Sequence, residues 1–490
     1  MPSYLMRTRR RLVTAGLLAA GLCTAAPDVR LRAAGAPAPV AAETVVLDRL
    51  QADIAIVKTY RPAYAFWQYI FMVADGRIAY GSATDGRLLA TFPTTGDWIR
   101  GARWEDLSLA ALVAGKRLPT RLKDRRDAVA RLLEPATGPV VHNPTRGLFL
   151  LPNAERYGRF LGEWGSIYER FGVPPEIGLA QAILESGLDG RARSSAKALG
   201  FCQWLPRNWD ALNRLTPHVI EAYNQTTQAP YCAAYLSILS TMYGSFIPAL
   251  SEHHTGGVNV GRVLINGERL GAADPREQYL KGAAFAKDLR SVSIRQYKEL
   301  FRTYGVHSFL YPEMVFGNAL TVARLGAETP QTPIYAMRAP RAIALTEVVR
   351  RTGLSTDEVK RFNPALARQV PARATLYLPA YEPEFGPDVS FWHRPTDPAF
   401  AGALNDFVAL EPGMQRRLAP AFEDTLRDFQ KRFAATGTEE GTVMAATLAY
   451  VIGDLRTSRR SAILNDFRNN GRILTLFQRG LRELGTLLPN

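Results

Sequence analysis

Cysteine and histidine are scarce in this sequence, which has three cysteines and six histidines among 490 residues. These few residues show no zinc-binding spacing, and neither a glycine-rich phosphate loop nor the Gly-x-Ser-x-Gly turn of α/β-hydrolases occurs. Zinc enzymes, P-loop nucleotidases and serine hydrolases of that fold are therefore disfavoured. We expect neither a metal nor a cofactor.

The first residues also lack an apolar run long enough to cross a membrane. Residues 12–22, LVTAGLLAAGL, are fewer than the roughly 20 that a spanning helix needs. A basic stretch, MPSYLMRTRRR, precedes this run and small residues, CTAAP, follow it, which is the form of an export signal. The sequence therefore predicts a signal peptide at 1–26 and export to the periplasm or cell envelope. A lipid anchor at Cys23 and membrane association remain alternatives, although Leu22 is not the small residue usual before a lipidated cysteine.

Acidic residues are outnumbered, since 60 Lys and Arg face 45 Asp and Glu and leave a formal net charge of +15. Such a charge favours a polyanionic partner: nucleic acid, an anionic lipid surface or an acidic polymer of the cell envelope. No nucleic-acid-binding module is recognisable and export argues against such a partner, so we expect no nucleic-acid binding. With 47% hydrophobic residues, the chain is expected to fold.

The spacing of apolar residues changes several times along the chain. The length of the chain favours more than one folded unit. The stretch WQYIFMVADGRIAYGSATDGRLLATF has two Asp-Gly turns, Asp75-Gly76 and Asp85-Gly86, between β-rich runs and predicts a small meander. From Asn153 to about Gly271, and again beyond Pro398, apolar residues recur three and four apart, which predicts helices. We expect a multidomain, mainly α protein. Its predicted parts are a linker at 27–43, a mixed α/β region at 44–140, a helical domain at 150–275, a helical extension and linker at 276–332, a small βααβ module at 333–380 and a C-terminal helical domain at 385–490.

One acidic residue stands out because it ends an apolar helix. The stretch GVPPEIGLAQAILESGLDG places Glu185 beside Ile183 and Leu184, and Pro174-Pro175 suits the start of that helix. Partial desolvation disfavours the charged carboxylate, so we expect burial to raise the pKa of Glu185 and to keep a proton available for general acid catalysis. A glutamate that merely faces water at a helix end is the alternative.

Seven residues around Glu185 match one pattern, which is Glu-Ser, then Ser-x-x-x-Ala-x-Gly-x-x-Gln, then Pro. With them, the sequence resembles the catalytic core of lytic transglycosylases with a lysozyme-like fold, most closely the membrane-bound lytic murein transglycosylase D group. The resemblance implies that Glu185 is the acid/base, that Ser186, Ser194 and Gln203 bind the glycan, and that Gly200 lets the glycan approach the backbone closely. The matching residues are Glu185, Ser186, Ser194, Ala198, Gly200, Gln203 and Pro206.

A second motif of that family is altered here. The segment YCAAYLSILSTMYGSFIPAL, with Tyr235-Leu236, is similar to the family's next helix, and the family's Ala-Tyr-Asn-x-Gly then falls on Glu252-His253-His254-Thr255-Gly256. We expect His253 and His254 to contact substrate in place of the usual Tyr and Asn. Adjacent histidines on a helix point about 100° apart, which argues against a metal site.

The resemblance implies a reaction with one carboxylate. The acid protonates the oxygen between N-acetylmuramic acid and N-acetylglucosamine, and the resulting carboxylate takes the proton of the muramyl 6-hydroxyl, which closes a 1,6-anhydro ring. Two alternatives remain: hydrolysis, if Asp189 serves as a second carboxylate, and a scaffold protein that binds peptidoglycan with weakened catalysis. Gly187 and Gly190 favour a helix break before Asp189.

Two further expectations concern the rest of the chain. Residues 335–379 resemble a LysM module, which binds glycans that contain N-acetylglucosamine, although Pro340-Arg341-Ala342 replaces its usual Gly-Asp-Thr. A spacer of βααβ form is the alternative. If the leader is removed beyond Cys23, only Cys202 and Cys232 remain, and we expect them to form a disulfide in an oxidising compartment.

Overall fold

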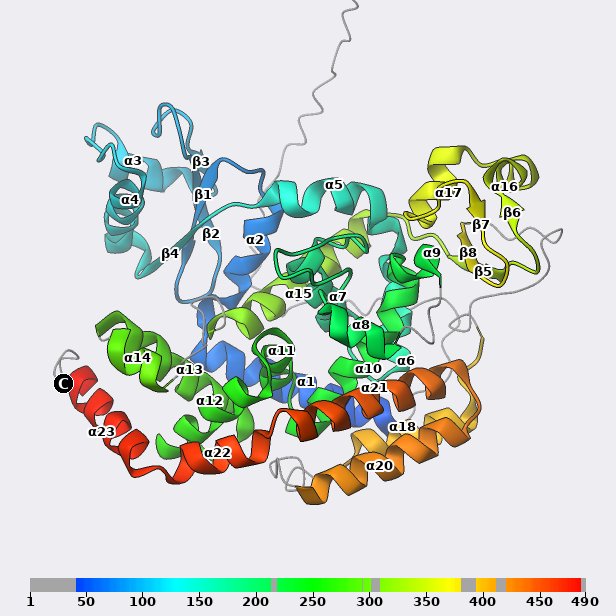
Figure 1. The fold of residues 1–490 in the computed structure, drawn as a ribbon. Coiled ribbons are helices and arrows are strands. Elements are labelled where there is room, and N and C mark those ends of the chain that lie inside the picture. Colours follow the sequence, from blue (N-terminus) through cyan, green and yellow to red (C-terminus); the bar gives the residue numbers. More distant parts are fainter. Residues whose placement is uncertain are drawn as a thin grey trace, which may run out of the picture. The chain divides into compact units, whose positions relative to one another are not determined.

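The computed structural model describes residues 41–212, 218–292, 294–300, 309–379, 394–410 and 420–485. The protein is mainly helical, with a small antiparallel four-stranded sheet near the N-terminus (Figure 1). This confirms the mainly α part of the expected class. The signal peptide at 1–26 with Cys23, most of the 27–43 linker and the linker after Pro379 lie outside the described residues.

The first described segment is helical and corrects part of the expected meander. It consists of α1 (Ala41–Tyr60), η1 (Pro62–Phe66) and α2 (Trp67–Met72). The run WQYIFM in α2 was expected to be β-rich, but Ile70 and Phe71 are buried where α2 packs on α5 and α15. Helical packing overrides the β preference of these residues.

The sheet follows directly. Its strands are β1 (Arg77–Ser82), β2 (Leu88–Pro93), β3 (Arg103–Trp104) and β4 (Val140–Pro144), in the order β3-β2-β1-β4. Asp85-Gly86 forms the predicted turn between β1 and β2, whereas Asp75-Gly76 precedes β1 and joins it to α2. The connections between β3 and β4 are η2 (Leu107–Leu109), α3 (Ala110–Val113) and α4 (Leu122–Thr137). Val129 and Leu133 of α4 share a core with Ile78 of β1.

Helices make up the centre of the chain, as expected from its periodicity. They are α5 (Gly147–Tyr157), η3 (Gly158–Phe160), α6 (Leu161–Arg170), α7 (Pro175–Ser186), α8 (Pro206–Leu212), α9 (Val219–Ala222), α10 (Gln225–Tyr243), α11 (Phe246–Thr255), α12 (Gly257–Arg269), α13 (Pro275–Val292), α14 (Ile294–Leu300) and α15 (Tyr311–Glu328). The helix that carries Glu185, α7, packs against α6, α10 and α15. Because α7 is surrounded, eight of its twelve residues are buried.

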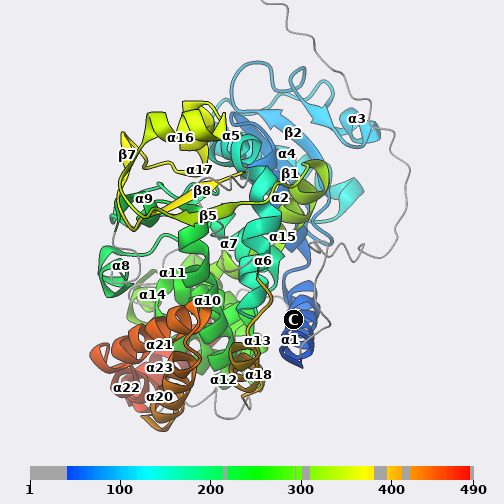
Figure 2. The same ribbon diagram turned by 90° about the vertical axis from the view of Figure 1, so that its right-hand side faces the viewer.

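The small module has the expected βααβ order, with two short extra strands. It contains β5 (Tyr335–Arg338), β6 (Ile343–Ala344), α16 (Leu345–Thr352), α17 (Thr356–Phe362), β7 (Gln369–Val370) and β8 (Thr375–Leu378). β5 pairs with β8 and β6 with β7, around a separate apolar core. Figure 2 shows this module beside α9. The Tyr377 and Thr227 hydroxyls lie 2.6 Å apart, and the backbone N–H of Thr375 donates to Glu221 Oε1 at 2.8 Å.

The C-terminal segment is helical, as predicted. It consists of α18 (Pro398–Val408), α20 (Pro420–Ala435), α21 (Glu439–Thr457), α22 (Arg460–Asn469) and α23 (Gly471–Gly485). Its side chains share the largest apolar core with the central helices, since Phe433 and Leu448 belong to the same cluster as Ile183. In both ribbon views α21 lies along α10 (Figures 1 and 2).

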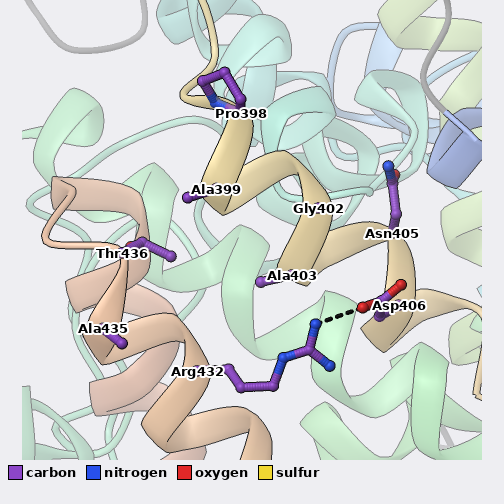
Figure 3. A pocket seen from close by; sticks show the side chains of 9 residues that line it. All are labelled: Pro398, Ala399, Gly402, Ala403, Asn405, Asp406, Arg432, Ala435 and Thr436. Carbon is purple, nitrogen blue, oxygen red and sulfur yellow. Dashed lines mark hydrogen bonds and ion pairs between the residues drawn. The ribbon is translucent and has the colours of Figure 1, made fainter.

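A shallow pocket of about 470 Å³ lies between α18 and α20, with an ion pair between Asp406 and Arg432 at its edge (Figure 3). None of its lining residues belongs to the group around Glu185 described below. Separately, the helices within the described ranges include none with the length and apolar character needed to cross a membrane.

Candidate active site

Glu185 lies in the last turn of α7, with 13% of its side chain exposed. The helix begins at Pro175, as the Pro174-Pro175 pair predicts, and ends where Gly187 adopts a left-handed conformation with φ 58°. A Cβ on Gly187 would lie 2.2 Å from the carbonyl oxygen of Phe149, so only glycine fits this turn. The sharp stop leaves the Glu185 carboxylate at the edge of the core rather than within it.

The loop after α7 is fixed by internal bonds. Ser186 is buried, and its hydroxyl donates to the carbonyls of Ala182 at 3.0 Å and Phe201 at 3.2 Å. The structure joins Cys202 to Cys232 in the expected disulfide, which ties the loop to α10. These bonds hold the matched motif residues beside the end of α7.

Two expected ligand contacts have a structural role instead. Ser186 was expected to bind substrate, but its hydroxyl is buried and bonded within the protein. Gly200 was expected to let the glycan approach, but a Cβ there would lie 2.4 Å from Gln228 Oε1, so the group that approaches it is a buried side chain. Its positive φ of 79° is a second reason for glycine.

Ser194 and Gln203 keep some capacity to bind a ligand. Ser194 is exposed, and its hydroxyl oxygen accepts the backbone N–H of Ala198 at 3.0 Å, which leaves the hydroxyl proton to donate. The amide group of Gln203 donates to the carbonyls of Ala192 at 3.0 Å and Gly200 at 3.1 Å. Gln203 can therefore offer a ligand its Oε1, but its amide protons are already used.

The last turn of α11 brings both histidines to Glu185. His253 Nε2 and His254 Nδ1 each lie 3.9 Å from Glu185 Oε1. The two residues differ in exposure, since 6% of the His253 side chain and 34% of the His254 side chain are accessible. His253 Nε2 is also 2.7 Å from the carbonyl oxygen of Cys202, which requires Nε2 to carry a proton and donate it.

Burial lowers the pKa of His253, against the opposing charge of Glu185. His253 is therefore neutral at neutral pH, with its Nε2 proton directed at the Cys202 carbonyl. The recipient is the protein backbone, so His253 holds the loop of Cys202 and at the same time borders Glu185.

Tyr311, which the sequence did not single out, completes the group. Its hydroxyl donates a hydrogen bond to Glu185 Oε1, and its ring stacks on that of His254 with centroids 4.3 Å apart and planes 9° apart. Tyr311 is the first residue of α15 and is buried. Burial and the charge of Glu185 raise the pKa of Tyr311, although the buried Gln181 opposes this, so the phenol remains a donor.

The electrostatics of Glu185 correct the expectation of a raised pKa. Burial alone would raise the pKa of this carboxyl, but the nearby imidazoles, that of His254 above all, and the Tyr311 hydroxyl outweigh it and lower the pKa below its ordinary value. The desolvation argument considered the apolar neighbours on α7 and omitted the imidazoles and the phenol that α11 and α15 supply. Glu185 is therefore a carboxylate at neutral pH.

Asp189 lies beyond the end of α7, as the two glycines predict. Its Oδ1 accepts the backbone N–H of Arg191 at 2.9 Å, which makes it part of a turn. Within the described ranges, no group of three His, Cys, Asp or Glu side chains is arranged to hold a metal ion. The reactive group in this region is thus a single carboxylate that accepts a hydrogen bond from Tyr311 and has two imidazoles beside it.

No family model matches the chain, and the curated proteins contain no match to it. The assignment of a function therefore rests on the geometry around Glu185 and on the sequence pattern.

Proposed function

We propose that this protein is a peptidoglycan lytic transglycosylase in which Glu185 is the sole acid/base. The observation that carries the proposal is the largely buried Glu185 carboxylate at the end of a buried helix, hydrogen-bonded to Tyr311 and flanked by His253 and His254. The family pattern from Glu185 to Pro206 occupies the adjoining loop. In this proposal the central helices form a domain with a lysozyme-like fold.

The proposed reaction needs one carboxyl group. Protonated Glu185 gives its proton to the oxygen that links N-acetylmuramic acid to N-acetylglucosamine, and the bond from that oxygen to the anomeric carbon breaks. The Glu185 carboxylate then accepts the proton of the muramyl 6-hydroxyl as this oxygen bonds to the same anomeric carbon. The product ends in a 1,6-anhydro ring, no water is consumed and Glu185 regains its proton.

The neighbours of Glu185 favour the second half of this reaction. Tyr311, His253 and His254 stabilise the carboxylate, which is the form that accepts the hydroxyl proton. The first half uses the protonated form, whose population at neutral pH is small because the pKa of Glu185 is lowered. We therefore expect an enzyme that works best in mildly acidic conditions.

The remaining parts fit a protein of the cell envelope. We propose that it is exported to the periplasm, where the Cys202–Cys232 disulfide can form. The βααβ module is proposed to be LysM-like and to bind N-acetylglucosamine in the same glycan strands. The module contacts Thr227 and Glu221 of the central helices, and this contact would let the module and the candidate active site bind the same glycan strand.

A second candidate is a peptidoglycan-binding scaffold with weakened catalysis. The observation that favours it is the lowered pKa of Glu185, because a carboxylate held ionised by two imidazoles and a phenol is a poor acid. A muramidase-type hydrolase is the third reading. It has less support because Asp189 is bonded in a turn past the helix.

Digestion of purified sacculi tests the proposal. The wild-type chain should release muropeptides with 1,6-anhydro ends, and Glu185→Gln should reduce that release at least about 1,000-fold, because the amide cannot transfer a proton. Glu176→Gln, in the first turn of the same helix, is the matched control and should remain active. Binding without release would favour the scaffold, and products with reducing ends would favour hydrolysis.

A further inference from the structure

The helix that carries His253 and His254 is held at its start by a buried carboxylate from another part of the chain. Asp53 of α1 accepts hydrogen bonds from the backbone N–H of Phe246 at 2.6 Å and from the Ser245 hydroxyl at 2.7 Å. Arg276 of α13 pairs with the same carboxylate at 2.6 Å. These contacts fix the first turn of α11 but do not determine where its last turn lies.

The last turn of α11 is held by a second buried ion pair. Arg460 donates from Nη1 to Glu252 Oε1 at 2.7 Å and from Nη2 to Glu252 Oε2 at 2.9 Å, which is a two-point contact. The Tyr243 hydroxyl also contacts both side chains. Arg460 is 2% and Glu252 5% exposed, so neither charge is screened by water.

Glycine at position 257 permits this approach. A Cβ on Gly257 would lie 2.2 Å from Arg460 Nη1 and 2.7 Å from Glu252 Oε1, so any larger residue would displace the guanidinium. The chain thus has a close fit between the start of α12 and the first residue of α22. This close fit holds the charged guanidinium of Arg460 in one position.

The helix before Arg460 is also connected to His253, through the aromatic ring of Tyr235 in α10. Arg460 follows α21, where Tyr450 stacks on Trp204 with centroids 5.9 Å apart and planes at 27°. Tyr450 also contacts Tyr235, whose ring lies 5.7 Å from that of His253. Figure 1 shows α21 and α22 passing α10 and α12 in succession.

We propose that Arg460 is a positioning residue of the candidate active site, which through the buried carboxylate of Glu252 holds the last turn of α11, and with it His253 and His254, against Glu185. The inference rests on the proposed function for its effect on activity. Its structural basis is independent of that function. Glu252 directly precedes His253, so a rotation of this turn moves both imidazoles, which lie 3.9 Å from Glu185 Oε1.

The principal test is a double replacement, Glu252→Gln with Arg460→Met, in the full chain. It removes the two-point contact without leaving a buried charge unpaired, so the variant has the best chance of folding. We expect kcat for release of anhydro-muropeptides to fall roughly 10- to 100-fold, with KM little changed, because a displaced group near the reacting atoms costs rate rather than binding.

A second readout does not depend on activity. NMR titration of histidine-labelled protein follows the six histidines, and replacing His253 or His254 identifies their signals. The groups that face the His253 ring are Glu185, His254, Tyr235 and the carbonyl of Cys202. Because burial lowers the pKa of His253, release of the last turn should move that pKa upward in the double variant.

A matched control removes another buried ion pair of the same C-terminal helices. Arg170 and Glu440 join α6 to α21 at 3.6 Å and are each 8% exposed. Arg170→Met with Glu440→Gln should lower stability but leave kcat and the His253 titration unchanged. If this control changes them as much, the effect is general loosening and the specific role of Arg460 is wrong.

Gly257→Ala provides the test if the double variant does not fold. The added methyl group displaces the guanidinium and leaves both charges in place, so a smaller change in the same direction is expected. A folded variant with unaltered His253 titration overturns the inference. If the wild-type chain releases no anhydro product, the proposed function fails, and the titration alone then decides the role of Arg460.

Discussion

The hydroxyl of Tyr311 donates a hydrogen bond to Oε1 of Glu185, although 126 positions separate the two residues in the chain. This bond stabilises the carboxylate and fixes its orientation at the end of α7. It also connects α15 to the candidate active site, since the ring of Tyr311 stacks on His254. The reactivity of Glu185 is thus set by residues from two other helices, α11 and α15.

Tyr311→Phe should raise the pKa of Glu185, because the hydrogen bond that it removes favours the charged form. The pH dependence of muropeptide release should then shift to higher pH, while the maximum rate falls because the carboxyl is less well oriented. Rate profiles of the wild type and the variant check this. A profile that does not move would show that the hydroxyl does not tune Glu185.

The activity itself should increase as the pH falls from neutral. The lowered pKa of Glu185 means that its protonated fraction increases about tenfold for each unit of decrease until the pH approaches that pKa. The measurement is kcat/KM on soluble glycan strands between neutral and mildly acidic pH, with circular dichroism to show that the protein stays folded. Activity that increases towards alkaline pH would contradict the assigned role of Glu185 as an acid.

Replacing both Cys202 and Cys232 by Ser should lower the free energy of unfolding by about 3 kcal/mol, since the disulfide closes a loop of 30 positions. It should also reduce activity, because the disulfide ties the loop that follows Glu185 to α10. Denaturant unfolding of both proteins, with and without reductant, checks the prediction. Equal stability of the variant and the oxidised wild type would show that the bond does not constrain the fold.

The small module offers a similar test at Asn363. The side chain of Asn363 donates to the Tyr377 carbonyl at 2.7 Å and accepts the Tyr377 N–H at 2.9 Å, so it joins α17 to β8. Asn363→Ala leaves both groups buried without this partner and should destabilise the module by about 2 kcal/mol. Hydrogen exchange at the Tyr377 amide should become faster, and unchanged protection would refute the prediction.

Local patterns were sufficient for the elements that carry most of the candidate site. The double proline at 174–175 and the glycine at 187 predicted where α7 begins and ends, and Asp85-Gly86 predicted the hairpin. The order of the βααβ module was also predicted correctly. Proline fixes φ and glycine readily adopts positive φ, so Pro174-Pro175, Gly187 and Gly86 mark the boundaries of α7 and the turn of the hairpin.

Contacts between segments far apart in the chain could not be predicted from the sequence. Nothing near Tyr311 indicates its partner, because Tyr311-Pro312 reads only as a helix start. Arg460 and Glu252 are 208 positions apart and look like ordinary charged residues of amphipathic helices. The lowered pKa of Glu185 was missed for the same reason, since the donors that lower it come from α11 and α15.

The most direct measurement is mass spectrometry of products formed from purified sacculi in water enriched with heavy oxygen. The account predicts muramyl ends that are 1,6-anhydro rings without heavy oxygen for the wild-type chain, and no such products above background for Glu185→Gln. Reducing muramyl ends that carry heavy oxygen, or anhydro products released equally well by the variant, would contradict the claim that Glu185 alone transfers the proton.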